Sequence, residues 1–457
     1  MTQGERLAAG SLGLAESVVM GVAGTAPAFS VAATTATLVA AVGVLSPACL
    51  LYCGLIMFGV ALAFRHLNRG DPNAGASYAW VTRAFGPVLG FFVGWSVLIA
   101  TAVFMLSGTV PAATATLALV APSLGSSVTA VTLVAAGWMI IVSAIAVKGI
   151  KLASYVQVAL TTVEVGILAF MIVVASIRCW GHPAHSFSFA SFSLGAFTPQ
   201  MFATGALTAV FVFWGWDVAL NLNEETRNAA ETPGLGAVLS MVVVLLVFVG
   251  FALATLLVLT DAEIEAAGTN VVQAVADKLF PRPWSYAAAL SVMLSTIGAL
   301  EATILSFTRT MYAKSRGKAL HSRYSRLHPI WRTPWVASGL LLGIGLVLIF
   351  MSSYLPTVAT IMRDSVNAIG LNAAFYYGLA SFACAWGSRG TVRGDPAAFV
   401  MRVLWPLASA LFLGFVAVYS IPTFDLATTL IGLGGIAVGV VPLFLNRRQM
   451  AIAALRS

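Results

Sequence analysis

Three acidic residues, Glu164, Asp217 and Glu301, lie within strongly apolar stretches of the chain. A charge at the centre of a bilayer costs about 3 kcal/mol, so such residues commonly carry protons, ions or substrate. For Glu164 the alternative is a permanently protonated carboxyl that only forms hydrogen bonds. For Asp217 it is a carboxylate that ties down a broken helix. For Glu301 we expect a bond to a neighbouring helix, ahead of one to a substrate amine or a proton shared with Glu164.

Two apolar stretches contain residues that interrupt helices. Gly21, Gly24 and Pro27 lie in the first, and Gly215 lies beside Asp217 in the other. Glycine and proline weaken the helical hydrogen-bond ladder, and such breaks persist in lipid only where protein or a wet cavity surrounds them. A proline kink or a packing glycine explains either break alone. Paired breaks in two halves of a chain indicate a transport site.

The breaks also predict a ligand class. Freed N–H groups at a half-helix start attract a carboxylate, and freed carbonyls at a half-helix end attract a cation or an ammonium group. An amino acid offers both groups, although an ion with a neutral substrate also fits. We expect substrate contacts from Ala23, Gly24, Thr25, Ala26, Phe211, Phe213, Trp214 and Gly215.

Side chains near the breaks add to this expected site. Phe211 and Trp214 are expected to line the cavity, where a ring can meet an ammonium group face-on. Ser295 and Thr296 either face the first break or bond back to their own helix. We expect coupling and gating from Glu164, Asp217, Glu301, Ser295 and Thr296.

The composition indicates a lipid environment. The chain has 457 residues, of which 60% are hydrophobic and 9% charged. Soluble domains have about 45–50% apolar and about 25% charged residues. A soluble enzyme is excluded, because charged residues must cover a water-facing exterior. The four cysteines lack metal-ligand spacing and no basic tract suits nucleic acid, so we expect no metal, no cofactor and no nucleic-acid partner.

Twelve segments approach or exceed the roughly 20 apolar residues that cross a bilayer. The expected spans are 14–42, 44–65, 86–119, 127–147, 152–177, 200–225, 236–260, 284–311, 334–353, 357–386, 399–420 and 426–446. The first ten residues lack a basic n-region and a cleavage site, so we expect the first span to be retained. The loops are short, which predicts one integral domain over 1–457. Two of the connections, 262–279 and 73–85, are either short helices or plain connectors.

Basic residues orient these spans. Most of the 24 Lys and Arg residues fall on the side of the termini, which assigns the termini to the cytoplasm. The exceptions are Arg178, Lys278, Arg282 and Arg363. Glu224 and Glu225 with Arg227 lie at the cytoplasmic end of the sixth span, as either an inner gate or a solvated cluster.

Four stretches, in order, resemble the amino acid–polyamine–organocation superfamily of permeases. They are Gly24-Thr25-Ala26; Ala74 to Trp80 with Phe85-Gly86-Pro87; Phe211 to Asp217 with Glu224-Glu225-Thr226-Arg227-Asn228; and Arg309 to Ala313 with Gly317, His328-Pro329 and Thr333-Pro334. Ala26-Pro27 departs from the family's second turn glycine, which puts the shape of its carboxylate cradle in doubt. Asn228-Ala229 replaces the usual Asn-Pro.

The resemblance implies an all-α LeuT-type fold. Two inverted five-helix repeats would cover about 12–177 and 200–386, with broken first and sixth helices, followed by two helices over about 399–446. Glu164 stands where many members have Lys, beside the site at which sodium-coupled relatives of the fold hold an ion. A protonatable group there can replace sodium, although sodium itself remains open.

We therefore expect a secondary transporter that imports an amino acid or related amine across the cytoplasmic membrane by alternating access, with protons as the coupling ion. Alternatives are a polyamine or organocation carrier, a substrate exchanger, or an amino-acid sensor that does not transport. A membrane enzyme would need a clustered nucleophile, metal ligands or a His–acid pair, and the sequence offers none of these.

Overall fold

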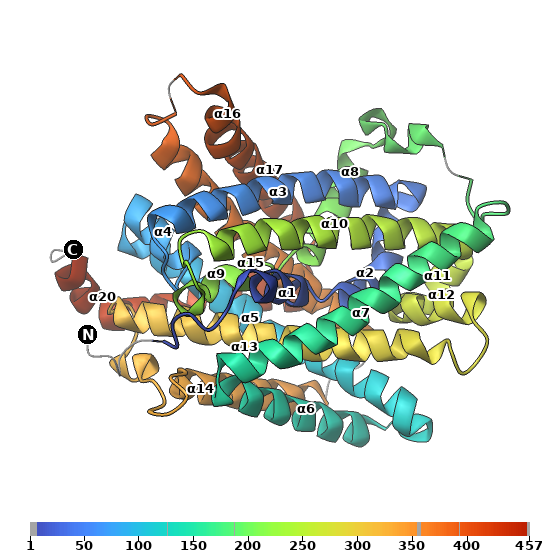
Figure 1. Cartoon of the computed structure of the whole chain (residues 1–457), viewed down its shortest axis with the longest axis horizontal. Helices are drawn as coiled ribbons and strands as arrows, with labels where there is room; N and C mark the ends of the chain where they lie inside the picture. The colour runs from blue at the N-terminus through green and yellow to red at the C-terminus, as the bar shows by residue number, and fades with distance from the viewer. Residues whose placement is uncertain (1–6, 126, 187, 354–357, 393, 455–457) are drawn as a thin grey trace.

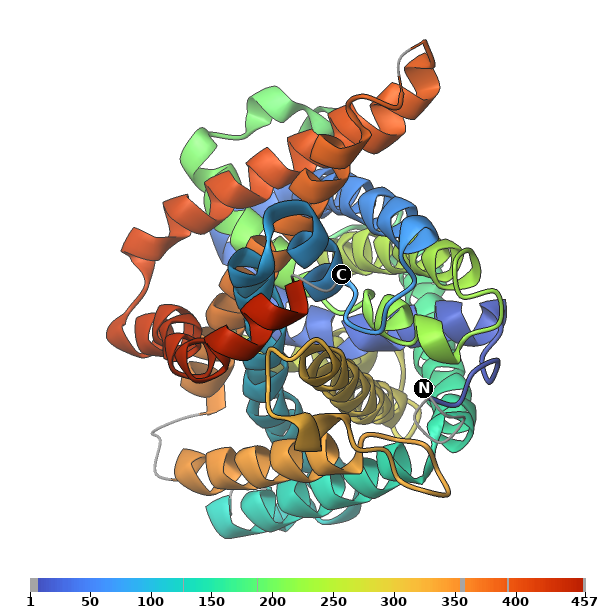
Figure 2. The same ribbon diagram turned by 90° about the vertical axis from the view of Figure 1, so that its left-hand side faces the viewer.

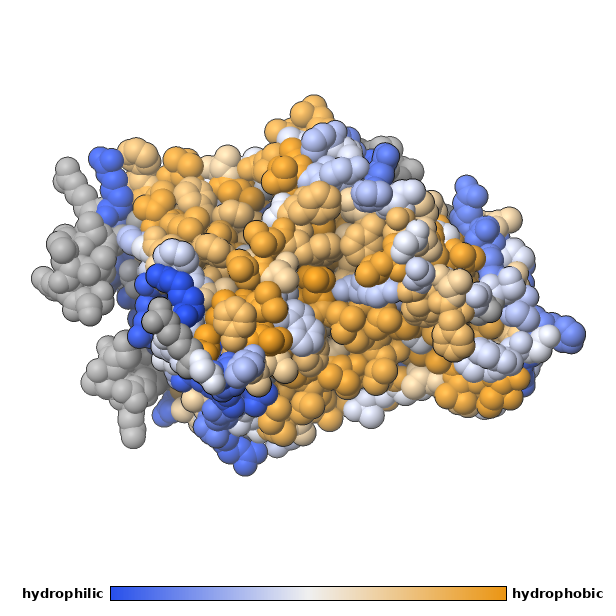
Figure 3. Space-filling model, turned by 90° about the horizontal axis from the view of Figure 1, so that it is seen from above, coloured by the Kyte–Doolittle hydropathy of each residue, from blue (hydrophilic) through white to orange (hydrophobic). Residues whose placement is uncertain are grey.

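The computed structural model describes residues 7–125, 127–186, 188–353, 358–392 and 394–454, and the regular structure in them is helical, apart from one isolated bridge between Leu12 and Thr226. Ten of its helical segments are long and apolar enough to cross a membrane. Figure 3 shows a broad apolar band between two hydrophilic ends. The protein is therefore an all-helical, multi-pass membrane protein.

The longest helices correspond to predicted spans. They are α3 (Ser46–Gly70), α5 (Pro87–Val120), α6 (Val128–Lys148), α7 (Ile150–Cys179), α10 (Thr232–Val258), α13 (Tyr286–Arg316), α14 (Trp335–Ser352), α15 (Val358–Ser388) and α17 (Trp405–Ser420). Shorter helices connect or extend them: α4 (Ser77–Phe85), α11 (Asp261–Ala267), α12 (Val271–Leu279), α16 (Pro396–Phe399), α18 (Leu426–Thr429), α19 (Gly435–Val438) and α20 (Val440–Ala454).

The first candidate segment, Leu14–Gly70, contains 57 residues. At 1.5 Å per residue it would extend about 85 Å, far beyond the roughly 30 Å of a hydrocarbon core, so it must turn back. It consists of α1 (Leu14–Thr25), α2 (Pro27–Val42) and α3, with a 3₁₀ turn at Gly43–Leu45 before α3. The first predicted break separates α1 from α2.

The second predicted break follows α8 (Pro199–Val212). This helix is apolar but too short to be counted among the ten candidate membrane spans. Helical structure resumes at α9 (Val218–Asn221). Between them the backbone unwinds, and Gly215 takes a φ of 108°, which glycine adopts at little cost.

Helix α13 occupies the centre of the bundle, packed against α5, α7 and α1 (Figure 1). Its side chains from Ser295 to Ser315 are buried without interruption. Helices α6 and α14 lie side by side at one edge, with α17 on the opposite side (Figure 2). The interrupted α1–α2 runs through the middle, and both described ends of the chain lie at the same end of the molecule (Figure 1).

The connection expected to hold one helix over 262–279 contains two, α11 and α12. Gly268 divides them, with a φ of 52°. Lys278 bonds to Glu263 at 2.7 Å, and this hydrogen bond, with those from Thr260, lowers the pKa of Glu263 to about 2. The ion pair links α12 back to α11. The short helix expected within 73–85 is α4.

Candidate functional site

The two helix breaks touch through their backbones at Gly24 and Gly215. A methyl group on Gly24 would lie 2.1 Å from the Gly215 carbonyl oxygen, and one on Gly215 would lie 2.1 Å from the Gly24 carbonyl oxygen. Only glycine at both positions permits this approach, because carbon and oxygen normally pack beyond 3 Å. The breaks, predicted separately from the sequence, therefore form one structural unit.

The turn between α1 and α2 is held by local hydrogen bonds. Ala26 adopts a left-handed conformation with a φ of 47°, and its N–H donates to the Ala23 carbonyl at 3.0 Å. The Ser30 hydroxyl donates to the carbonyl of Thr25 at 2.6 Å, and Pro27 supplies the first residue of α2. Proline suits that position because its missing N–H would have no helical acceptor.

The free N–H groups at the start of α2 bind side chains of two other helices. Glu164 of α7 accepts the Ala28 N–H at 3.0 Å, and Ser295 of α13 accepts the Phe29 N–H at 3.1 Å. The Ser295 hydroxyl donates to Glu164 at 2.6 Å. A carboxylate suits the positive end of a helix dipole. The protein's own carboxylate thus accepts an amide of this half-helix start, at Ala28, beyond the residues Ala23 to Ala26 from which substrate contacts were expected.

Asp217 is held by two consecutive tyrosines of α15. Tyr377 donates to its carboxylate at 2.7 Å and Tyr376 at 3.1 Å. The same hydroxyls accept N–H groups from the second break, Trp214 Nε1 at 2.9 Å and the Gly215 amide at 3.2 Å. Asp217 therefore ties the broken helix to α15, and it also lines a cavity.

Replacing Tyr377 by Phe should lower the free energy of unfolding by about 1–3 kcal/mol, because the change removes one donor to buried Asp217 and the acceptor for the Gly215 amide. Denaturation of the purified protein measures the change. Tyr419→Phe, at a residue with 37% exposure, is the matched control. Equal stability of the two variants would contradict the contacts described for Asp217.

A small cavity lies where the breaks meet. Its volume is about 10 Å³, roughly what one water needs. The residues around it are Gly24, Val97, Thr101, Trp214, Gly215, Asp217, Val218, Ala302, Thr303, Ser306 and Tyr376. An amino acid would require this cavity to expand.

A second pocket, of about 250 Å³, lies between α2, α5, α12 and the start of α13. Phe29 lines it, and three rings in contact connect it to the central cavity. Phe29 packs edge-on against Phe104 with centroids 5.7 Å apart, and Phe104 packs against Trp214 at 5.6 Å. These aromatic rings stand between the pocket and the cavity.

On the opposite side, hydrogen bonds and ion pairs close the cavity. Ser306, which lines it, donates to Asn221 at 3.0 Å, and Asn221 donates to the Ala74 carbonyl at 3.1 Å. Glu224 accepts the Ala74 N–H at 3.0 Å and binds Arg316 through both carboxylate oxygens. This polar chain ends at Arg316, the last residue of α13.

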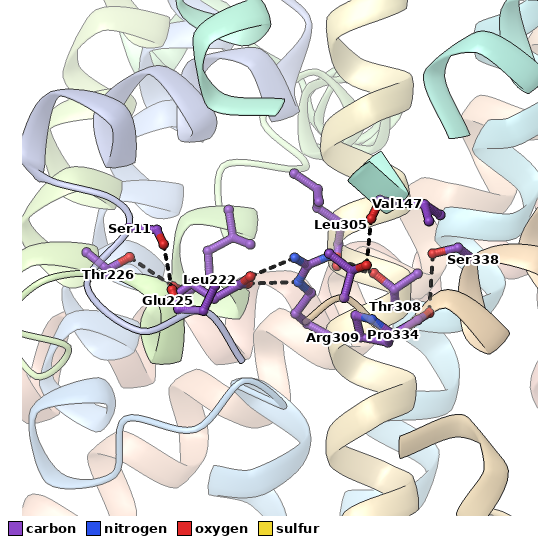
Figure 4. Close-up of polar contacts among 12 residues, drawn as sticks. Ser11, Val147, Leu222, Glu225, Thr226, Leu305, Thr308, Arg309, Pro334 and Ser338 are labelled. Carbon is purple, nitrogen blue, oxygen red and sulfur yellow. Dashed lines mark hydrogen bonds and ion pairs between the residues drawn. The ribbon is translucent and has the colours of Figure 1, made fainter. Parts of the chain in front are cut away.

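Glu225 forms a bidentate ion pair with Arg309 at 2.8 and 2.9 Å (Figure 4). Their side chains are 0% and 1% exposed. The Ser11 and Leu12 amides donate to the Glu225 carbonyl, which attaches the N-terminal segment at this point. For Glu225 the alternative of a solvated cluster is therefore wrong, and its partner is Arg309 of α13 rather than nearby Arg227.

The remaining predicted residues have varied surroundings. The Thr296 hydroxyl donates to carbonyls of its own helix, which was the alternative to its facing the first break. Phe213 packs against Phe248 of α10, with ring centroids 5.3 Å apart. Among the residues that the structure describes, buried Glu301 Oε1 has no hydrogen-bond partner, so the structure does not show the bond expected from this oxygen to a neighbouring helix. Of the predicted substrate contacts, those that do not line the central cavity are Ala23, Thr25, Ala26, Phe211 and Phe213. Of the predicted coupling and gating residues, only Asp217 lines it.

Sequence reasoning missed several residues around the breaks. They are Tyr376, Tyr377, Asn221, Ser306 and Phe104. The adjacent tyrosines within an apolar span were a usable signal, because a phenol in lipid needs a partner for its hydroxyl. Among the residues that the structure describes, no cluster of His, Cys, Asp or Glu could hold a metal ion.

Comparison with known proteins agrees with this architecture. The family described as amino acid permease matches residues 12–441. The serine/threonine exchanger SteT of Bacillus subtilis is 24% identical over 361 residues, covering 76% of this chain and 75% of the exchanger. The low-affinity putrescine importer PlaP of Escherichia coli is 27% identical over 279 residues, or 60% of each chain.

The b(0,+)-type amino acid transporter 1 of Mus musculus is 24% identical over 274 residues, covering 58% of this chain and 54% of that transporter. The matches to PlaP and to this transporter thus span less than two thirds of those relatives' own lengths. The match to the family covers nearly the whole chain. The protein belongs to the amino acid permease family, within the amino acid–polyamine–organocation superfamily that its motifs resemble.

Proposed function

We propose that this protein is a secondary transporter, not an enzyme, that imports an amino acid or related amine by alternating access with proton coupling. The observation that carries the proposal is the contact between Gly24 and Gly215, which brings two broken helices together at a buried cavity. Such paired breaks provide binding groups in the middle of a membrane and permit rocking of helices about them.

The proposal includes a fold of twelve crossings. Dividing Leu14–Gly70 into two crossings and counting α8–α9 as a further one raises the ten candidates to twelve. Two inverted repeats, over about 12–177 and 200–386 within one domain, would then each begin with an interrupted helix. The last two crossings would be α16–α17 and α18–α20. With an even number of crossings and basic segments beside both ends, the termini lie in the cytoplasm.

Glu164 is the proposed coupling residue. When ionised, it accepts the Ala28 N–H and the Ser295 hydroxyl and so fixes the start of α2 to α7 and α13. Protonation would remove the charge that the helix N-terminus attracts and weaken this attachment. Movement of α2 about the turn at Ala26 would then couple proton uptake to opening of the aromatic layer formed by Phe29, Phe104 and Trp214.

The cavity supports an amine-bearing substrate. Asp217 and Trp214 line it, and a carboxylate with an aromatic ring suits an ammonium group. Two of the three relatives above are named for amino acids and one for putrescine, and all of these substrates carry amines. The family match favours an amino acid. Exchange of two amino acids is the second candidate, because SteT is named an exchanger.

Uptake by purified protein in liposomes tests the proposal, with labelled serine, threonine, leucine and putrescine, each with and without an inward proton gradient. We expect gradient-driven accumulation of at least one of them by the wild type. Glu164→Gln should abolish accumulation and retain counterflow exchange, because exchange requires no net proton movement. The matched control is Glu265→Gln, an exposed acid at the end of α11, which should behave as wild type.

Other outcomes separate the alternatives. Counterflow without any response to the gradient would contradict proton coupling and favour exchange. Accumulation of putrescine alone would favour a polyamine carrier. Binding of serine or leucine without flux would favour a sensor.

A further inference from the structure

The buried face of α7 changes character along its length. Between its N-terminus and the middle it carries the polar residues Ser154, Gln157, Thr161 and Glu164, and beyond them Leu168, Met171 and Ala175. The polar residues recur at intervals of three and four, so they share one side of the helix. All four are at least 95% buried. This polar row extends from Glu164 toward one end of the helix only, about 20 Å to exposed Lys151.

Several polar atoms of this row and of the facing part of α13 have no partner among the described residues. Both amide atoms of Gln157, the Thr161 hydroxyl and Glu301 Oε1 are buried and form no hydrogen bond. Gln157 packs on α13, because its Nε2 lies 2.8 Å from where a methyl group on Gly298 would stand. Glu301 follows Gly298 by about 4.5 Å along α13. Native proteins usually satisfy such atoms with internal water.

We propose that Gln157 and Thr161 hold water molecules that conduct protons between Glu164 and the cytoplasmic end of α7, with Glu301 as a second proton acceptor beside them. This inference rests on the proposed proton coupling at Glu164. The buried face of α7 beyond Glu164 is apolar, so the proton leaves Glu164 toward the N-terminus of α7.

The transfer is a relay through water. The O–H bond of protonated Glu164 breaks, its proton binds the nearest water, and that water passes one of its own protons onward. Glu164 becomes a carboxylate, and the final acceptor is Glu301 or cytoplasmic water. Gln157 and Thr161 orient the waters and exchange no proton themselves, so they are positioning residues.

Other charged groups near α7 already have partners or lie outside this row. Titratable residues on the helices packed against α7 are Glu16 on α1, Lys148 on α6, Asp277 and Lys278 on α12, and Tyr286, Glu301, Arg309, Tyr312, Lys314 and Arg316 on α13; α2 and α10 carry none. Arg309 pairs with Glu225, Arg316 with Glu224, and Lys314 donates to the Phe91 carbonyl. Lys278 pairs with Glu263 of α11. Glu263 has a pKa of about 2, so it stays ionised at the pH of an uptake experiment.

Gln157→Leu and Thr161→Val test the inference in the full-length protein, using labelled serine, threonine, leucine and putrescine in liposomes that contain a pH-sensitive dye. We expect each variant to slow initial gradient-driven uptake and its associated proton influx by about tenfold. The final accumulation ratio and counterflow should match wild type, because a path for protons affects rate and not equilibrium. Thr161→Ser should restore the rate. Thr162→Val, at an exposed neighbour, is the matched control.

Each other result overturns the inference in a distinct way. A wild type that ignores the proton gradient refutes the proposed coupling and the path together. A proton-driven wild type with equally fast variants refutes the path alone. Parallel loss of counterflow and driven uptake in both variants assigns Gln157 and Thr161 to packing. Loss of the accumulation ratio itself, as expected for Glu164→Gln, would make them part of the coupling site.

Discussion

Gly24→Ala should destabilise the protein by at least about 3 kcal/mol and abolish uptake. The added methyl group would lie 2.1 Å from the Gly215 carbonyl oxygen, 2.8 Å from its carbonyl carbon and 3.1 Å from Val218. Backbone atoms cannot rotate away as a flexible side chain can. The Gly215 amide is held by Tyr377, so the second break cannot retreat without losing that bond. Thermal unfolding in detergent and uptake in liposomes measure the two effects.

Gly215→Ala should be at least as harmful. Its methyl group would meet the Gly24 carbonyl oxygen at 2.1 Å, and its φ of 108° strains any side-chain-bearing residue. Gly343→Ala on α14 is the matched control, because a methyl group there meets no atom within 4 Å. Alanine favours a helix over glycine by about 1 kcal/mol, so this control should be neutral or slightly stabilised. Normal uptake by Gly24→Ala would show that the breaks do not touch.

The breaks themselves were predictable because their causes are local. Gly24 and Pro27 disfavour a continuous helix wherever the chain folds, and the structure interrupts the helix at Ala26. The apolar runs predicted spans for the same reason, since burial in lipid depends on the length of the run.

The contacts of the site were less predictable because they join residues far apart in the chain. The partners of Asp217 lie 159 and 160 residues away, on α15. Unwinding between Phe213 and Asp217 also breaks the helical period, so spacing alone could not tell which aromatic ring faces the cavity. Trp214 lines it, as expected, whereas Phe211, which was also expected there, does not, and Phe213 faces α10.

The ion pair at the opposite end of the site shows the same limit. Arg309 and Glu225 each belong to a recognisable motif, but the sequence alone grouped Glu225 with nearby Arg227, as an inner gate or a solvated cluster. Proximity in the chain was misleading, because the 3₁₀ turn Asn223–Glu225 directs Glu225 toward α13 instead of toward the following residues.

Breaking this buried pair is the second large effect that we expect. Glu225→Gln should lower the free energy of unfolding by about 3–5 kcal/mol, because the Arg309 guanidinium would remain buried without a countercharge. Arg309→Met should cost a similar amount by stranding the carboxylate. The exposed pair of Arg69 and Glu231, with 40% and 45% exposure, is the matched control, and Glu231→Gln should cost about 1 kcal/mol or less.

The double variant Glu225→Met with Arg309→Met separates the two contributions. Removing both charges leaves neither one stranded, so the double variant should be more stable than either Glu225→Gln or Arg309→Met. Uptake then tests the gate directly. If opening toward the cytoplasm requires the pair to separate, the apolar double variant should transport substrate at a changed rate, whereas a purely structural pair should leave the rate unaltered. A cost for Glu225→Gln no larger than that for Glu231→Gln would contradict the buried pair itself.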